Sequence, residues 1–373
     1  MRKKILKISA ITLLSAIFLF LGIAGCINIV RYSNIPDDDF NYLKGDANKV
    51  ILFIGDGMGE AHIENAEMYL EKDLFINSIE KHGKVTTFSK NTYWPTDSAA
   101  SATALATGEK VYNTRVAYEN KKHIKTISEL AKEQGLGVGI VTTDLLSGAT
   151  PSAFSAHALK RSQTDQIIKT QLENKIDLYI GAGNETYSLY KTEWESKGYT
   201  FVQTYDELLN TKQEGKIIAS FKSLGHTPSD NEATLSLVFE YAIEYFEKNF
   251  PNGYFLMVEG AHIDKMNHSN KVEEMIYYLN DFDKTINLAY DRFYNDPDFC
   301  MIITADHESG GLKLADSKAQ ITNDLYTTDG HTAKKVRYFI YQKGNDDINK
   351  IPNIIDNTSV FKINKNLLDL EQK

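Results

Sequence analysis

Continuous apolar runs recur along the chain between residues 49 and 341, and segments with helical spacing separate them. Six runs end at glycine or polar residues, and they cover 50–54, 138–141, 178–180, 254–258, 301–303 and 337–341. Such runs are typical of strands in a parallel sheet that is covered on both faces. Residues 124–134, 232–249 and 272–294 have the spacing of helices. This alternation predicts an α/β fold, a three-layer α/β/α sandwich around a mostly parallel central sheet.

Groups that bind metals stand at the ends of four of these strands. The residues are Asp56 after the first run, Glu259 to His268 after the fourth, Asp306 and His307 after the fifth, and His331 before the last. In α/β sheets, ligands gather at the carboxyl ends of the strands. Any one of these residues alone is more often a capping carboxylate or a solvated histidine. Four strand ends that share this chemistry predict a metal site.

The residue types divide into three sets of ligands. Two sets contain both nitrogen and oxygen, and they are Asp264 with His268 and His331, and Asp56 with Asp306 and His307. Each suits zinc with an open coordination position. Glu259 and Thr150 are hard oxygen donors that match magnesium better. The glycines at 57 and 59 let backbone and ions approach closely, consistent with Asp56 being shared between metals.

A candidate nucleophile lies in the Ala-rich stretch 96–108. Pro95 disfavours helix at the residue before it, Thr96 or Asp97 can cap the first turn, and Gly108 suits a helix end. Ser98 then stands in the first turn, where free N–H groups and the helix dipole favour an anion. A serine there can be phosphorylated if its hydroxyl is ionised. No histidine is beside it in the sequence, so we expect a metal to ionise it. Taken alone, the stretch also fits an ordinary packed helix.

The first 47 residues are predicted to lie outside the fold. Four basic residues precede an apolar run over 8–24, and small residues then precede Cys26. This pattern predicts a signal peptide over 1–25 with a lipobox-like end, lipidation of Cys26, and an extracytoplasmic location at the cell envelope. An uncleaved anchor and a plain secretory signal are the alternatives. Residues 26–47 are interpreted as a polar tether, and 48–373 as a single catalytic domain.

Composition supports one large globular unit and limits its partners. Hydrophobic residues make up 42% of the chain and aromatic residues 11%, which is enough for a substantial core. The formal net charge is −9, and it becomes more negative once the basic signal residues are removed. This charge argues against a nucleic-acid partner. Of the two cysteines, Cys300 lies in an apolar setting that suggests burial, and no disulfide framework is expected.

The motifs together resemble the alkaline phosphatase family of the classical three-metal type. They stand in the family's order: 55–59 (GDGMG), 96–100 (TDSAA), 149–151 (ATP) with Arg161, 258–268, 304–307 (TADH) and 330–332 (GHT). The resemblance extends from about residue 49 to 362, nearly all of the chain after the signal.

The resemblance implies a role for each matching residue. Ser98 would be the nucleophile that forms a phosphoserine, and Arg161 would bind two phosphate oxygens in a bidentate geometry. Two Zn²⁺ ions would be held by Asp264, His268 and His331, and by Asp56, Asp306 and His307. One Mg²⁺ would be held by Asp56, Thr150 and Glu259. Lys265 would bind phosphate through water, although a plain surface lysine is an equal alternative.

Three positions depart from the family pattern. Gly148 stands where bacterial relatives have Asp and animal relatives have His, so the third metal site is expected to be weaker, differently occupied, or completed by another residue. Asn267 replaces a carboxylate. The short interval between His307 and His331 leaves no room for the crown insertion of animal forms, so a dimer built on a crown is not expected; we expect a monomer or another homodimer.

The leading hypothesis is therefore hydrolysis of small phosphate monoesters through a phosphoserine, serving phosphate scavenging at the envelope. Two alternatives remain. One is a phosphodiesterase or sulfatase of the same superfamily. Arg161 and the magnesium set of Glu259 and Thr150 disfavour the diesterase, and the motif with a modified Cys or Ser that sulfatases use is absent. The other is a non-catalytic phosphate- or metal-binding lipoprotein, disfavoured because the nucleophile and all six zinc ligands are present.

Overall fold

The computed structural model describes residues 38–91, 94–225 and 233–371, and a single central sheet runs through them. Ten strands form it in the order β14-β2-β13-β10-β1-β9-β5-β6-β8-β7. Their bounds are β1 Lys49–Gly55, β2 Lys81–Thr86, β5 Gly137–Leu145, β6 Leu178–Ala182, β7 Tyr199–Val202, β8 Lys216–Phe221, β9 Tyr254–Gly260, β10 Phe299–Thr304, β13 Val336–Gln342 and β14 Ile354–Asp356. All six strands predicted from apolar runs are present.

The sheet is mostly parallel, as predicted. Strand β1 lies at its centre, paired in parallel with β10 on one side and β9 on the other. Only β13 among these ten strands runs against its neighbours, β10 and β2. Because β1, β9, β10 and β5 are parallel neighbours, their carboxyl ends meet at one edge of the sheet. This edge is where the predicted ligands should converge.

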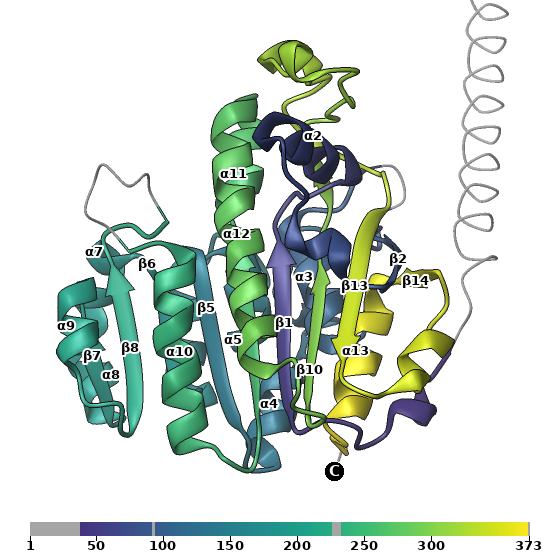
Figure 1. The fold of residues 1–373 in the computed structure, drawn as a ribbon. Coiled ribbons are helices and arrows are strands. Elements are labelled where there is room, and N and C mark those ends of the chain that lie inside the picture. The colour runs from purple at the N-terminus through teal and green to yellow at the C-terminus, as the bar shows by residue number, and fades with distance from the viewer. Residues whose placement is uncertain (1–37, 92–93, 226–232, 372–373) are drawn as a thin grey trace, which may run out of the picture.

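Helices cover both faces of the sheet, which confirms the three-layer sandwich (Figure 1). One face carries α10 and α12, and the other carries α3, α4, α5 and α13. The helices are α2 Glu60–Leu70, α3 Ser98–Thr107, α4 Ile127–Glu133, α5 Ala149–Ser155, α6 Thr164–Asn174, α7 Asn184–Tyr187, α8 Lys191–Ser196, α9 Tyr205–Asn210, α10 Leu235–Asn249, α11 His262–His268, α12 Val272–Phe293 and α13 Asn357–Leu367. The three helices predicted from periodicity correspond to α4, α10 and α12.

Two small two-stranded sheets and six 3₁₀ turns complete the described part of the fold. Two hairpins lie outside the central sheet: β3 Tyr118–Glu119 with β4 Lys122–His123, and β11 Glu308–Ser309 with β12 His331–Thr332. The 3₁₀ turns are η1 Asn41–Leu43, η2 Phe75–Ser78, η3 Ser188–Tyr190, η5 Lys318–Gln320, η6 Asn323–Leu325 and η7 Asp346–Lys350. The β11–β12 hairpin contributes to the site described below.

The folded part of the chain reaches back further than the tether predicted over 26–47. Phe40 and Leu43 are fully buried in the main core, and the backbone N–H groups of Gly45 and Ala47 bond to carbonyls at the end of α13. Residues 38–47 therefore belong to the domain. The interpretations of residues 1–25 and of Cys26 lie outside the described residues. Among the residues described, no helix is long and apolar enough to cross a membrane.

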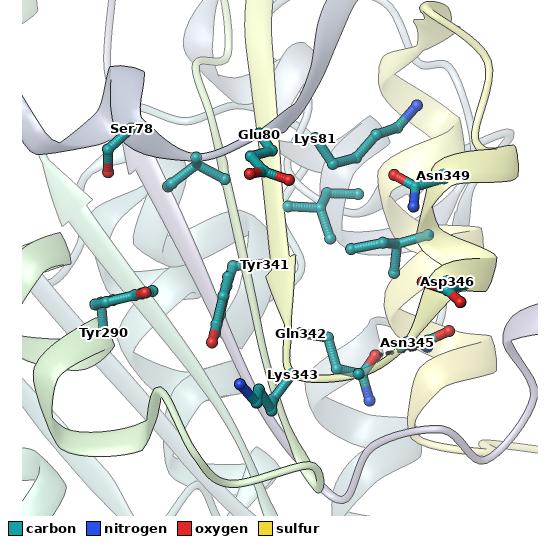
Figure 2. Close-up of a pocket in the computed structure, with 14 residues that line it drawn as sticks. Ser78, Glu80, Lys81, Tyr290, Tyr341, Gln342, Lys343, Asn345, Asp346 and Asn349 are labelled. Carbon is teal, nitrogen blue, oxygen red and sulfur yellow. Dashed lines mark hydrogen bonds between the residues drawn. The ribbon is translucent and has the colours of Figure 1, made fainter.

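A hollow of about 360 Å³ lies at the amino edge of the sheet, where β2 begins and β13 ends (Figure 2). Its lining includes Ser78, Lys81, Tyr290, Tyr341 and Asn345. None of the predicted site residues lines it. The candidate chemistry is gathered at the other edge of the sheet.

Candidate active site

Ser98 begins helix α3, as the sequence predicted. Asp97 is the cap, because its Oδ1 accepts a hydrogen bond from the Ala100 N–H at 3.0 Å, and Gly108 ends the helix with a φ of 72°. Ser98 is buried, with 3% of its surface exposed. Its hydroxyl thus lies at the positive end of the helix dipole, where a negative charge on the oxygen or on a bound phosphoryl group is stabilised.

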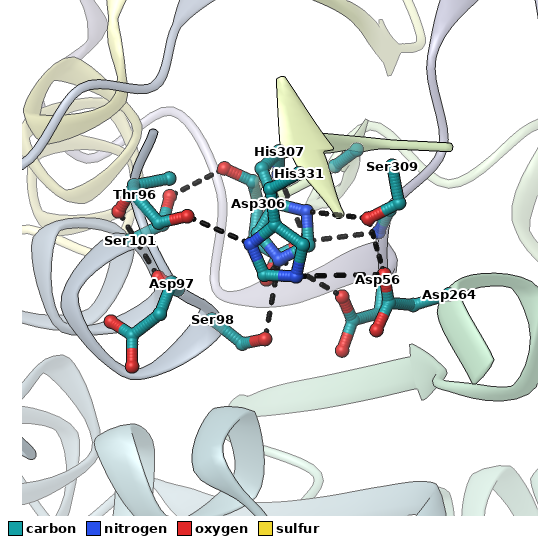
Figure 3. Close-up of polar contacts among 12 residues, drawn as sticks. Asp56, Thr96, Asp97, Ser98, Ser101, Asp264, Asp306, His307, Ser309 and His331 are labelled. Atoms are coloured by element: carbon teal, nitrogen blue, oxygen red, sulfur yellow. Dashed lines mark hydrogen bonds and ion pairs between the residues drawn. The ribbon is translucent and has the colours of Figure 1, made fainter. Parts of the chain in front are cut away.

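Asp56, Asp306 and His307 surround this hydroxyl (Figure 3). They follow the adjacent strands β1 and β10. His307 Nε2 lies 3.2 Å from Ser98 Oγ, 3.2 Å from Asp306 Oδ2 and 3.5 Å from Asp56 Oδ1. The backbone N–H groups of Gly57 and His307 donate to Asp306 Oδ1 and fix that carboxylate. The loop after β10 thereby brings two consecutive side chains to one point.

The fold places a histidine beside Ser98, which the sequence alone did not indicate. A serine–histidine pair acting as in a serine hydrolase would need a carboxylate on the far ring nitrogen, Nδ1. Here His307 Nδ1 faces the Ser309 hydroxyl at 3.2 Å, and both carboxylates lie on the Nε2 side with Ser98. The imidazole nitrogen, the two carboxylates and the serine hydroxyl therefore face the same point. This is how the ligands of a metal ion are arranged, and it does not fit a histidine acting as general base.

Asp264, His268 and His331 form a second group next to the first. His268 Nε2 lies 3.2 Å from Asp264 Oδ2 and 3.1 Å from His331 Nε2, while His331 Nε2 lies 3.9 Å from Asp264 Oδ1. The spacing of four residues puts Asp264 and His268 on one face of α11. His331 arrives through the β11–β12 hairpin, where it pairs with Ser309. Its ring stacks on that of His307 with centroids 3.6 Å apart, so the two groups adjoin.

Gly57 permits the close contact between the first strand and α11. Its φ is 71°, and a Cβ there would lie 2.7 Å from Asp264 Oδ1 and 3.0 Å from the Asp264 Cα. Only glycine fits both the backbone conformation and the space. The sequence-based inference that the glycines after Asp56 allow close approach is thus explained by a particular contact.

Glu259 and Thr150, the predicted magnesium ligands, supply oxygens to a third group near Asp56. Glu259 is the sixth residue of β9, and Thr150 is in the first turn of α5. Glu259 Oε2 accepts a hydrogen bond from the Thr142 hydroxyl, but Glu259 Oε1 and Thr150 Oγ1 are buried without a hydrogen-bond partner among the described residues. The same holds for Asp56 Oδ1 and Asp306 Oδ2. Buried oxygens left unpaired in this way fit cation ligands.

The charges in the site lead to the same conclusion. Burial raises the pKa of Asp306 to about 7 and that of Glu259 to about 8, with neighbouring carboxylates adding to both shifts. Burial, then the charge of Asp306, holds the pKa of Asp56 well above its usual range. Burial also lowers the pKa of His307, so its ring is neutral and cannot neutralise these carboxylates. Cations would supply the missing positive charge.

His268 and Asp264 behave differently because they bond to each other. That hydrogen bond raises the pKa of His268 to about 9. Burial alone would raise the pKa of Asp264, but the bond from His268 and the nearby imidazoles hold it below its usual range. A cation bound here would have to displace the His268 proton, so binding at this group would release a proton.

Arg161 and Lys265, the two predicted substrate-binding cations, lie in different surroundings. Arg161 Nη1 is 3.5 Å from Asp97 Oδ2, which puts the guanidinium beside the cap of the Ser98 helix, with 38% of its side chain exposed. Lys265 Nζ instead contacts Asp144 Oδ1 at 2.5 Å. The structure thus places Arg161 beside the cap of the helix that Ser98 begins, and it pairs Lys265 with Asp144, which is not among the residues predicted from the sequence.

Sequence reasoning also missed Ser309. Its hydroxyl donates to Asp264 Oδ1 and contacts His307 Nδ1, so it links the two groups of ligands. A serine two residues after a predicted ligand was the available signal, since it can orient both the histidine and a carboxylate.

Comparison with known proteins decides the family. The family model described as alkaline phosphatase matches residues 47–367. The chain belongs to the alkaline phosphatase family. It is 30% identical over 345 residues to alkaline phosphatase 4 of Bacillus subtilis, covering 84% of this chain and 71% of the relative.

Solved alkaline phosphatases share the fold. The enzyme from the Antarctic bacterium TAB5 superposes with a TM-score of 0.77 at 27% identity, covering 87% of this chain and 99% of that chain. A His-to-Asp variant of the TAB5 enzyme with Mg bound in its M3 site gives a TM-score of 0.76 at 25% identity, covering 88% and 100%. These relatives identify the chain as a phosphomonoester hydrolase with a metal-binding site.

Proposed function

We propose that this alkaline phosphatase hydrolyses small phosphate monoesters in two steps through a phosphoserine on Ser98. The observation that carries the proposal is the position of Ser98 Oγ, at the start of α3 and 3.2 Å from the imidazole nitrogen that also faces Asp56 and Asp306. In the first step Oγ bonds to phosphorus as the ester P–O bond breaks and the alcohol leaves. In the second step water cleaves the Ser98–phosphate bond, which releases phosphate and restores the hydroxyl.

The residues would share the work as follows. Asp56, Asp306 and His307 would hold one Zn²⁺, and Asp264, His268 and His331 a second. Asp56, Thr150 and Glu259 would hold Mg²⁺, the ion found in the M3 site of the TAB5 variant. Such ions, when bound, stabilise the entering and leaving oxygens of an in-line displacement. The N-terminus of α3 and Arg161 would bind the phosphoryl oxygens, and Asp97 would orient Arg161.

We further propose that the enzyme works at the cell envelope and scavenges phosphate there. The support is the basic, apolar and small-residue pattern before Cys26, which suits lipid attachment at that cysteine. The acidic net charge supports small phosphate esters over nucleic acids as substrates.

The test is a comparison of a nitrophenyl phosphate monoester with the matched diester, using protein reconstituted with zinc and magnesium. Replacing Ser98 by Ala removes the attacking oxygen, so monoester turnover should fall by on the order of 10³-fold or more. Arg161→Ala removes charged hydrogen bonds to the phosphoryl group, so kcat/KM should fall roughly 10- to 100-fold. Labelled phosphate should be trapped on the peptide that contains Ser98 after an acid quench.

Ser236→Ala, which alters a buried serine of α10 away from the site, is the matched control and should keep full turnover. Equal or better turnover of the diester, indifferent to Arg161, would instead make the protein a phosphodiesterase. Monoester hydrolysis that survives in Ser98→Ala would rule out the phosphoserine.

A further inference from the structure

The third group of ligands lacks a side chain at position 148, and Asp144 lies where that side chain would be. A Cβ built on Gly148 would stand 2.1 Å from Asp144 Oδ2, 2.8 Å from Asp144 Cγ and 2.8 Å from the Leu145 carbonyl oxygen. Gly148 has a φ of −58°, which any residue can adopt, so the backbone does not require glycine. The Asp144 carboxylate fills most of the space that a side chain at 148 would take, and the Leu145 carbonyl limits the rest.

Strand β5 fixes Asp144 beside Glu259. Thr142 pairs with Glu259 in register, and its hydroxyl donates to Glu259 Oε2. Asp144 follows Thr142 by two residues, in the part of β5 where the register with β6 shifts. The Asp144 N–H donates to Thr142 Oγ1 at 2.8 Å, which ties the three residues together. After burial, the charge of Asp144 is the largest cause that raises the pKa of Glu259.

One oxygen of Asp144 is paired and the other is not. Oδ1 contacts Lys265 Nζ at 2.5 Å, while no hydrogen bond from a described residue reaches Oδ2. Thr150 Oγ1 and Glu259 Oε1, both fully buried, are also unpaired within the described ranges. The Thr150 hydroxyl is near enough to Glu259 to lower the pKa of that carboxyl. Together they are hard oxygen donors suited to Mg²⁺, which keeps several of its waters and needs groups that orient them.

We propose that Asp144 supplies to the third cation site the carboxylate that position 148 lacks, accepting hydrogen bonds from cation-bound water. The inference rests on the third cation site of the proposed function. It adds Asp144 to that site in place of a side chain at position 148. Lys265 holds Asp144 in this position. Of the three outcomes expected from the sequence for this site, the structure thus favours completion by another residue.

The test is magnesium binding to the full-length chain loaded with zinc, measured by isothermal titration and by the magnesium-dependent rise in Tm. Loss of a residue that orients a metal's ligands or water weakens affinity 10- to 100-fold, so Asp144→Ala should raise the magnesium Kd by about that factor. The double variant Asp144→Ala/Gly148→Asp returns a carboxylate to the same space and should recover a Kd within about threefold of wild type.

Asp347→Ala is the matched control, because Asp347 is also paired with a lysine, Lys350 at 2.6 Å, but lies in η7 at the opposite edge of the sheet. Its magnesium Kd should equal that of wild type. An unchanged Kd in Asp144→Ala, or a double variant that stays as weak as the single one, would overturn the inference. A wild-type chain that holds zinc but binds no magnesium would instead refute the third site itself.

Discussion

His62 is a fully buried histidine whose protonation opposes folding. Its Nδ1 accepts a hydrogen bond from the Gly59 N–H at 3.0 Å, and burial, with Lys334 nearby, lowers its pKa to about 4. Between pH 6.5 and 4 the unfolded chain binds a proton that the folded chain does not. Stability should therefore fall as the pH drops through this range, with His62 contributing on the order of 3 kcal/mol.

Replacing His62 by Asn keeps an acceptor for the Gly59 N–H and removes the titration. Urea unfolding of metal-free protein between pH 7 and pH 4 should show a smaller loss of stability in His62→Asn than in wild type. His82→Asn, at an exposed position of β2, is the control. Equal pH slopes in wild type and His62→Asn would contradict the assignment.

The identity of most site residues could be predicted from the sequence, but their contacts could not. The ligands stand directly after apolar strands, so local pattern was enough to find Asp56 or Asp306. The contact between Ser98 and His307 joins residues 209 positions apart, and no local pattern indicates it. Asp144 stands only four residues before Gly148, but the contact of its carboxylate with the space beside Gly148 depends on the backbone between them, which no residue pattern specifies.

At the scale of elements, α13 packs against α3, the helix that Ser98 begins. Asn357 Nδ2 donates to Ser101 Oγ at 3.0 Å near the start of α3, and the Phe361 ring packs on Gly108 at its end. Ser101 in turn donates to the Asp306 carbonyl at 2.5 Å. The C-terminal helix is thus connected to both the nucleophile and a metal-binding loop.

Phe361→Ala should therefore affect both stability and turnover. Truncating this buried ring should lower the free energy of unfolding by about 3–5 kcal/mol, and the looser α3 should lower kcat on the order of tenfold. Phe221→Ala, equally buried in β8 at the far end of the sheet, should lose similar stability with unchanged kcat. Denaturant unfolding and steady-state kinetics on the folded protein would check this, and equal kcat values would exclude a role for α13 in positioning Ser98.

Elements with a strong apolar pattern were predictable, and the sheet margins were not. Strand β2 has several exposed or half-buried positions, and β7 is four residues long, so neither has a continuous apolar run. Strand β2 takes its place by pairing with β13, which is distant in the sequence. Strand β7 takes its place by pairing with β8, which lies in a stretch without recognisable motifs. The segment 38–47 has the composition of a tether, because its polar residues outnumber the few apolar ones that anchor it.

At the scale of the whole molecule, the cations should be part of the fold's stability. Carboxylates just after β1 and β10 and one near the end of β9 meet in a buried space, where burial and mutual repulsion disfavour their charged forms. Ions that bind only the folded chain stabilise it by about 2.7 kcal/mol per site at a hundred times Kd. Chelation should then lower Tm by roughly 10 °C or more, and added zinc should restore it.

Calorimetry with and without chelator measures this effect, and activity should be lost and regained in step with Tm. Magnesium added alone is the control, because the two histidine-containing groups favour zinc. A Tm that chelation leaves unchanged would show that the carboxylates are accommodated without cations.

The place of β1 has a consequence for the order in which the protein matures. Lys49 near its start pairs with Tyr254 and with Phe299, and the last ligand, His331, comes later still. A chain synthesised only to a point before Asp306 can present isolated carboxylates and imidazoles, but it cannot assemble either histidine-containing group. Assembly of the complete site therefore requires synthesis through His331, and any truncation before His331 yields a protein without the complete site.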